Sequence, residues 1–174
     1  MINRIALLLV GMVTLGGCGN MADPIAALGD PTARTTDSLG LPYNPSSISL
    51  SSWAPYNGAS GANFGFSFNL GGVLYQALAP AAGVIANVDT SGVRIIHNVH
   101  LTSLVAGTGL VVTARAGDAV VAGGFLGNFT AGTPLYFTVY YDGVPICPYS
   151  FMTSAARAYL TPAATLANLA ACSN

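Results

Sequence analysis

The sequence has 174 residues, of which 52% are hydrophobic and only 6% are charged, and its formal net charge is −1. An average soluble protein is roughly 25% charged, and this chain has no basic patch that would suit a nucleic acid, so we expect no nucleic-acid partner. The 21 glycines and 8 tyrosines indicate instead a β protein with glycine between its strands.

The N-terminus joins a positive residue to a short apolar stretch. Arg4 precedes the apolar residues 5–15, a length too short to span a bilayer comfortably. The stretch ends on Leu-Gly-Gly-Cys at residues 15–18, which resembles a bacterial lipobox, in which the cysteine is acylated and becomes the first mature residue. The resemblance predicts a lipoprotein signal peptide over residues 1–17 and lipidation of Cys18. An ordinary signal peptide or an uncleaved anchor is the alternative.

A lipidated Cys18 would hold the chain on the periplasmic side of the bacterial cell envelope. Residue Gly19 is not the aspartate that retains lipoproteins in the inner membrane of enteric bacteria, which favours the outer membrane.

Residues 18–62 are rich in Gly, Pro, Ser, Thr and Asn and show little periodicity. This composition predicts a tether or extended arm between the anchor and the domain. A bare linker seldom carries aromatic residues, so we expect Tyr43, Trp53 and Tyr56 to dock on the domain.

Residues 63–149 are predicted to form a domain of short strands. FGFSFNL alternates Phe64, Phe66 and Phe68 with smaller or polar residues, the period of a half-buried strand. GVIANV and GVRIIHNV are β-branched runs, and LVVTA precedes a turn at residues 116–118. LYFTVYY and VPIC flank Asp-Gly at residues 142–143, a dipeptide typical of a type I′ hairpin.

Residues 150–174 form an alanine-rich tail, in which residues 150–160 are predicted to be a short helix stopped by Pro162. In an oxidising compartment, Cys147 and Cys172 are expected to pair and tie the tail to the domain, with two free thiols as the alternative.

The only two histidines, His97 and His100, lie three residues apart in RIIHNVHLTSL. This β-branched stretch should be extended, so their side chains should point to opposite faces of a strand, one inward and one outward. A zinc site needs three or four converging ligands. The pair alone therefore predicts no metal site.

Four phrases occur in order along the predicted domain: ALAPAAGVIANV, VHLTSL, ARAGDAVVAGGFLG and GTPLYFTVYYDGVPICP. The third resembles the "GD-x-V-x-AG-x-x-IG" phrase of LytM-type (M23 family) peptidoglycan peptidases and other duplicated-hybrid-motif proteins. The order of all four is similar to the LytM domain in particular. The resemblance implies an all-β fold, a LytM-like β-sandwich or barrel of short antiparallel strands, with the extended N-terminal arm and the short C-terminal helix added.

The resemblance also shows which catalytic groups are missing. The family holds its zinc with a His and an Asp four residues apart and with the second His of an "H-L-H" strand. Here Asn69 is the nearest counterpart of that Asp, no histidine lies upstream, and the "H-L-H" positions are Pro134, Leu135 and Tyr136. His100, before Leu-Thr, matches the catalytic histidine of the family's "H-L-S/T" phrase and is a remnant.

From this mapping we expect a binding groove formed by Asn69, His100, Pro134 and Tyr136, without metal or other cofactor. An amide and a phenol are weak zinc ligands beside imidazole and carboxylate. Without the metal, no water at this site is activated.

The resemblance therefore favours a catalytically inactive LytM-like envelope lipoprotein. Such a protein would bind peptidoglycan or an envelope protein, for example to control cell-wall hydrolysis, and would reach the membrane through its lipid anchor. One alternative is an M23-type zinc peptidase with rearranged ligands that recruits His97 or an aspartate. A second is a structural subunit of an envelope assembly.

Overall fold

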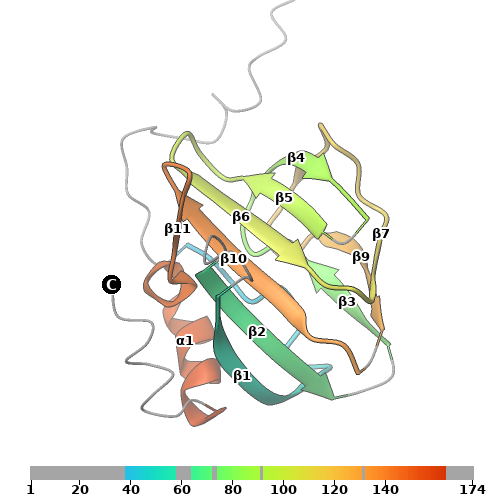
Figure 1. Ribbon diagram of the computed structural model, residues 1–174, viewed down its shortest axis with the longest axis vertical. Helices are drawn as coiled ribbons and strands as arrows, with labels where there is room; N and C mark the ends of the chain where they lie inside the picture. Colours follow the sequence, from blue (N-terminus) through green and yellow to red (C-terminus); the bar gives the residue numbers. More distant parts are fainter. Residues whose placement is uncertain (1–37, 58–63, 72–73, 91, 131, 164–174) are drawn as a thin grey trace, which may run out of the picture.

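The computed structural model describes residues 38–57, 64–71, 74–90, 92–130 and 132–163, which form two antiparallel sheets and one short helix (Figure 1). The larger sheet contains β1 (Ser49–Asn57), β2 (Phe64–Gly71), β4 (Gly83–Val88), β5 (Gly92–Ile96), β6 (Leu101–Ala106), β8 (Ala119–Val120), β10 (Leu135–Tyr141) and β11 (Val144–Ile146). The smaller sheet contains β3 (Leu74–Leu78), β7 (Leu110–Val112) and β9 (Phe125–Thr130). The predicted all-β class is confirmed.

In the larger sheet, whose order is β1-β2-β10-β6-β5-β4-β8, β10 lies between β2 and β6. One edge of β10 pairs with β6, while β2 and β11 pair with β10 along different parts of its length. The smaller sheet has the order β3-β9-β7. β10 therefore pairs with three other strands of the larger sheet.

The core gathers apolar side chains from both sheets and from the C-terminal helix. Along β2, Phe66 and Phe68 are fully buried, whereas the intervening Ser67 is half-buried and Asn69 is exposed. This alternation confirms the predicted half-buried strand; the side chain of Phe64 lies outside the described residues. Burial of one such phenylalanine stabilises the fold by roughly 1.5–3 kcal/mol.

The predicted arm is a domain element over the part that the structure describes. Residues 49–57 form β1, which pairs with β2 along its length, and the expected docking of Tyr43 and Trp53 is confirmed because both lie in the core. Trp53 packs 4.6 Å from the ring of Phe66 and donates its indole N–H to the Leu160 carbonyl at 3.0 Å. The prediction of a tether is therefore wrong over residues 38–57, because this Ser- and Pro-rich segment also contains apolar side chains that are buried in the core. The side chain of Tyr56 lies outside the described residues.

The Asp-Gly turn and the short helix predicted at the C-terminal side of the domain are both confirmed, although the helix begins at Ser154 and not at residue 150. Asp142 (φ 50°) and Gly143 (φ 76°) both adopt the left-handed conformation, as a type I′ turn requires between β10 and β11. The helix α1 (Ser154–Leu160) follows a 3₁₀ turn, η2 (Pro148–Phe151), and begins where the Thr153 hydroxyl accepts a hydrogen bond from Ala156 N. A second 3₁₀ turn, η3 (Thr161–Ala163), contains Pro162 and ends the described chain.

Cys147 is fully buried and disulfide-bonded. Cys172 and Cys18 lie outside the described residues, so the pairing with Cys172 and the lipidation of Cys18 stay predictions. No helix in the described ranges has the length and apolar character needed to cross a membrane.

Candidate functional site

The start of β10 carries the residues that the sequence aligned with the family's zinc-binding strand. Leu135 and Phe137 point into the core, so the half-buried Tyr136 between them points to the opposite, outer face of the larger sheet. Tyr136 is paired with Ser67 of β2 on one side and with Ala106 of β6 on the other. Pro134 directly precedes the strand.

Asn69 lies near this point on the neighbouring strand. It is two residues from Ser67 and therefore on the same outer face, and its side-chain amide donates to the Ser52 hydroxyl of β1 at 2.9 Å. The structure thus brings Asn69, Pro134 and Tyr136 to one end of the β2–β10 pair. The residue of β2 directly opposite Tyr136 is Ser67, which the sequence resemblance did not include. The alternation of β2 places Ser67 on the same face as Asn69, but only the register of β2 against β10 sets it beside Tyr136.

His100 does not join this group. It precedes β6, and the register pairs Leu101 with Tyr141, whereas Tyr136 pairs with Ala106 at the other end of β6. Five residues of strand separate the two ends, a span of roughly 17 Å. The expected groove that unites His100 with Asn69 and Tyr136 is therefore not formed, because the phrase containing His100 comes before its strand and not at the end that reaches Tyr136.

Position 107, at the end of β6 that does reach Pro134, has no room for a side chain. Gly107 follows Ala106, and a Cβ atom at position 107 would lie 2.5 Å from the ring of Phe129 and 2.9 Å from the Pro134 carbonyl. Both distances are shorter than real Cβ contacts. Packing of Phe129 against this backbone therefore replaces any side chain here.

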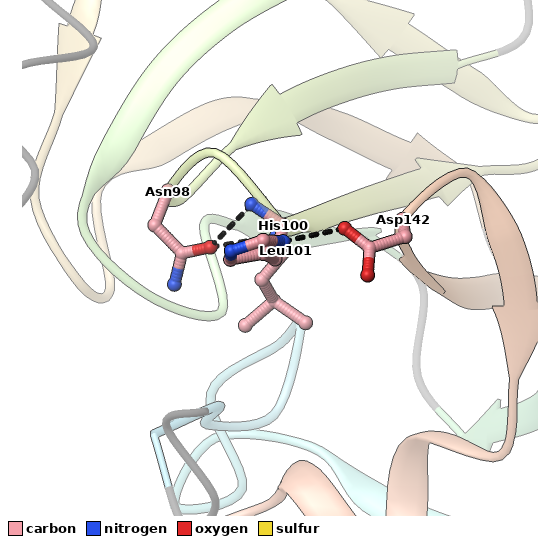
Figure 2. A network of polar contacts seen from close by, with 4 residues as sticks. All are labelled: Asn98, His100, Leu101 and Asp142. Atoms are coloured by element: carbon pink, nitrogen blue, oxygen red, sulfur yellow. Dashed lines mark hydrogen bonds and ion pairs between the residues drawn. The ribbon is translucent and has the colours of Figure 1, made fainter. Parts of the chain in front are cut away.

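The histidine stretch is a tight turn and not one continuous strand. β5 ends at Ile96, and the backbone N–H groups of His97 and Asn98 both donate to the Leu101 carbonyl, at 2.9 and 3.3 Å. The Asn98 side chain accepts hydrogen bonds from the N–H groups of His100 (2.9 Å) and Leu101 (2.7 Å), as Figure 2 shows. An asparagine that binds its own backbone two residues ahead favours a turn, which overrides the β-branched run.

His97 faces inward, as predicted for one of the two histidines, and is only 7% exposed. Its Nδ1–H donates to the Ala82 carbonyl at 2.8 Å, so its Nε2 accepts from the Ser103 hydroxyl, also at 2.8 Å. Burial lowers the pKa of His97, while the hydrogen bond to Ala82 acts in the opposite direction. Ser103 is fully buried, so this Ser–His pair fastens the fold and cannot meet a substrate.

His100 faces outward and binds the β10–β11 hairpin. Its Nδ1 contacts the Asp142 carboxylate (Figure 2), and the Asp142 N–H donates to the His100 carbonyl at 2.9 Å. The imidazole also stacks on Tyr141, with ring centroids 5.6 Å apart. The two side chains are 32% and 58% exposed, and an ion pair exposed to this degree contributes about 0–1 kcal/mol.

Among the residues that the structure describes, neither end of β10 has the donors of a zinc centre. A serine, an amide, a proline and a phenol surround its start, and one imidazole with one carboxylate lies at its other end. Within the described ranges, no three His, Cys, Asp or Glu side chains are grouped so as to hold a metal ion.

No family model and no curated protein matches the chain. Solved structures do match. A chain of the SpoIIQ–SpoIIIAH pore-forming complex is similar at a TM-score of 0.51 and 18% identity, over 74% of this chain and 99% of that one. A putative peptidase M23 from Pseudomonas aeruginosa matches at 0.52 and 21%, over 75% of this chain and 57% of its own.

The M23 metalloprotease pseudoalterin, from the deep sea, matches at a TM-score of 0.54 and 17% identity, over 67% of this chain and 78% of its own. The chain thus spans all but 1% of one relative and little more than half of another. Identities this low establish the fold alone. The described domain has the fold of the LytM-like domains of M23 peptidases.

Proposed function

We propose that this chain is a catalytically inactive LytM-like lipoprotein of the bacterial cell envelope that binds an envelope protein partner. The observation that carries the proposal is the outer face around Tyr136. The sequence resemblance aligns the start of β10 with the family's zinc-binding strand, and this face presents Pro134, Tyr136 and Ser67, none of which is a good zinc ligand.

The outer face has the composition of a protein interface. Leu104 and Ala106 of β6 are half-buried beside Tyr136, and Asn69 is exposed next to them. Arg94 of β5 lies over the ring of Tyr140, 4.6 Å from its centroid, on the same face. Tyrosine and arginine are enriched at protein interfaces, and other charged residues are depleted at their cores. The similarity in fold to a chain of a protein–protein complex supports the same conclusion.

Site-specific photo-crosslinking tests the partner. The full chain is expressed in a bacterial envelope with p-benzoylphenylalanine at position 136 or, as a control, at position 111, where Val111 of β7 is 64% exposed on the smaller sheet. We expect position 136 to give one discrete adduct, identified by mass spectrometry as an envelope protein, that position 111 does not give. Adducts with glycan strands alone would contradict a protein partner and identify peptidoglycan as the binding partner. No adduct from position 136 would contradict the proposed surface.

The lipid anchor is tested separately. Metabolic labelling with an alkyne fatty acid should label the native chain and not the Cys18→Ser variant, and fractionation should place the native chain with the outer membrane. Label that persists in Cys18→Ser would contradict lipidation at this residue.

A zinc peptidase with rearranged ligands is the competing function. It requires stoichiometric zinc in the purified chain and cleavage of muropeptides, both lost when His97 or another recruited ligand is replaced. We expect neither zinc nor cleavage. Either result with the native chain would overturn the assignment as an inactive protein.

A further inference from the structure

A concave site lies away from the outer face of the larger sheet. Four segments surround it: the residues before β1, the β3–β4 connection, the β8–β9 turn and the start of α1. Its volume is about 460 Å³, within the range of small-molecule sites. The lining residues are Ser38, Gly40, Leu41, Tyr43, Asn44, Pro45, Leu78, Ala79, Pro80, Ala122, Gly123, Thr153, Ala155, Ala156 and Tyr159.

The lining selects against charge. None of these residues is Asp, Glu, Lys, Arg or His, and most of the wall is aliphatic, with two tyrosine rings. A charged ligand would lose its hydration here without a compensating partner, whereas an apolar one would lose little. The walls come from segments far apart in sequence that backbone hydrogen bonds hold together, including Gly40 N to Pro80 O at 2.6 Å and Gly123 N to Ala79 O at 2.8 Å. The cavity is thus built into the fold.

One polar group in the wall has no hydrogen-bond partner. Tyr43 is 1% exposed, its ring packs on Phe68 at 5.3 Å and Tyr159 at 6.5 Å, and its hydroxyl makes no hydrogen bond in the part of the chain described. Burial, with a smaller contribution from Tyr159, raises the pKa of Tyr43, so this hydroxyl is a neutral donor. The neighbouring Tyr159 hydroxyl instead donates to the Ile48 carbonyl at 3.2 Å. A buried hydroxyl without a hydrogen-bond partner is rare in proteins, so an acceptor on a bound molecule would complete the hydrogen bonding of Tyr43.

We propose that this cavity binds a small, uncharged and mainly aliphatic molecule whose carbonyl or ether oxygen accepts a hydrogen bond from the Tyr43 hydroxyl. The cavity gives the molecule apolar walls, and the hydroxyl fixes its orientation. Because the hydroxyl is itself covered, the acceptor reaches it after a small shift of the wall. This site is separate from the partner surface around Tyr136, and neither proposal depends on the other.

The test uses the full chain with ¹³C-labelled alanine methyl groups and two probes of matched shape. The probes are 4-tert-butylcyclohexanone and its exocyclic methylene analogue, which lacks the oxygen acceptor. We expect saturable shifts at the methyl groups that line the cavity, those of Ala79, Ala122, Ala155 and Ala156, and not at exposed Ala158 on the same helix. The ketone should bind about fivefold more tightly than the methylene analogue, the worth of one hydrogen bond.

Three variants separate the contribution of the cavity from that of the hydroxyl. Tyr43→Phe should weaken the ketone about fivefold and leave the methylene analogue unchanged. Ala155→Trp, which fills the cavity from α1, should abolish binding of both probes, whereas Ala158→Trp should leave both unchanged. Shifts spread over all alanines, or none, would overturn the site. Equal ketone affinity in Tyr43→Phe and the native chain would overturn the role of the hydroxyl.

Discussion

His97 and His100 belong to one turn and are only three residues apart, yet the fold uses them in opposite ways. His97 is buried, and both of its ring nitrogens have partners from other segments, Ala82 and Ser103. His100 is half-exposed and binds an exposed aspartate at the tip of a hairpin. The same residue type therefore joins buried segments by hydrogen bonds at one position and makes only a solvent-exposed contact at the other.

The largest expected effect is that of His97→Ala. The change removes two hydrogen bonds, leaves the Ser103 hydroxyl and the Ala82 carbonyl without their partner, and opens a cavity beside these two residues. We expect the free energy of unfolding to fall by about 2–4 kcal/mol, measured by urea denaturation. A loss below about 1 kcal/mol would mean that His97 does not fasten the interior.

The Asn98→Ala change tests the turn that joins the two histidines. Asn98 accepts from two backbone N–H groups, so its removal should destabilise the fold by about 1–2 kcal/mol in the same denaturation experiment. Asn98→Asp keeps the accepting oxygen and should restore most of this stability. If Ala and Asp variants were equally unstable, the side-chain oxygen would not be what shapes the turn.

The third prediction concerns pH. Burial lowers the pKa of His97 in the folded chain, whereas the unfolded chain titrates near 6.5. Between the lowered pKa and about 6.5 the unfolded state binds more protons, so the contribution of neutral His97 is complete above that range. It is lost as the pH falls, by at most about 1.4 kcal/mol per pH unit.

Urea denaturation between pH 7.5 and 5.0 measures this slope. His97→Gln should flatten the slope, while His100→Gln should leave most of it in place. Equal slopes in native chain and His97→Gln would show that another group causes the pH dependence.

The smallest expected effect lies at the exposed pair. Asp142→Asn removes the charge that faces His100 but keeps a residue suited to the left-handed turn before Gly143, so it should change stability by less than about 1 kcal/mol. The change should shrink further in 1 M salt. A larger loss of stability that does not change with salt would mean that this pair contributes to the stability of the fold as much as His97 does.

Much of this fold can be predicted from the sequence, because most of its strands and turns are determined by residues next to one another in the chain. The phenylalanines of β2, the β-branched runs of β4 and β5 and the Asp-Gly of the β10–β11 hairpin each determine their own short element. The segment 38–57 was harder, because its buried Leu39, Tyr43 and Trp53 stand among serines and prolines without a clean period.

The site was predicted less well because it depends on cross-strand register. The sequence resemblance aligned His100 with the catalytic histidine of the family's "H-L-S/T" phrase. Only the pairing of Leu101 with Tyr141 shows which end of β10 it reaches. The same register pairs Ser67 with Tyr136, a relationship between residues far apart in sequence that no local pattern contains. The cavity beside Tyr43 is formed by four segments and could not be read from any one of them.

The backbone pairing beside that cavity has a mechanical consequence. Ser38 N and Leu39 N both donate to the Phe151 carbonyl, at 3.0 and 2.9 Å, and Thr153 N donates to the Leu39 carbonyl at 2.8 Å. A pull on the chain ahead of Ser38 is therefore borne first by this clamp between the entry of the domain and its C-terminal helix, and not by β1. Ser38, Gly40 and Thr153 also line the cavity. A molecule bound there would therefore raise the force needed to separate these two segments.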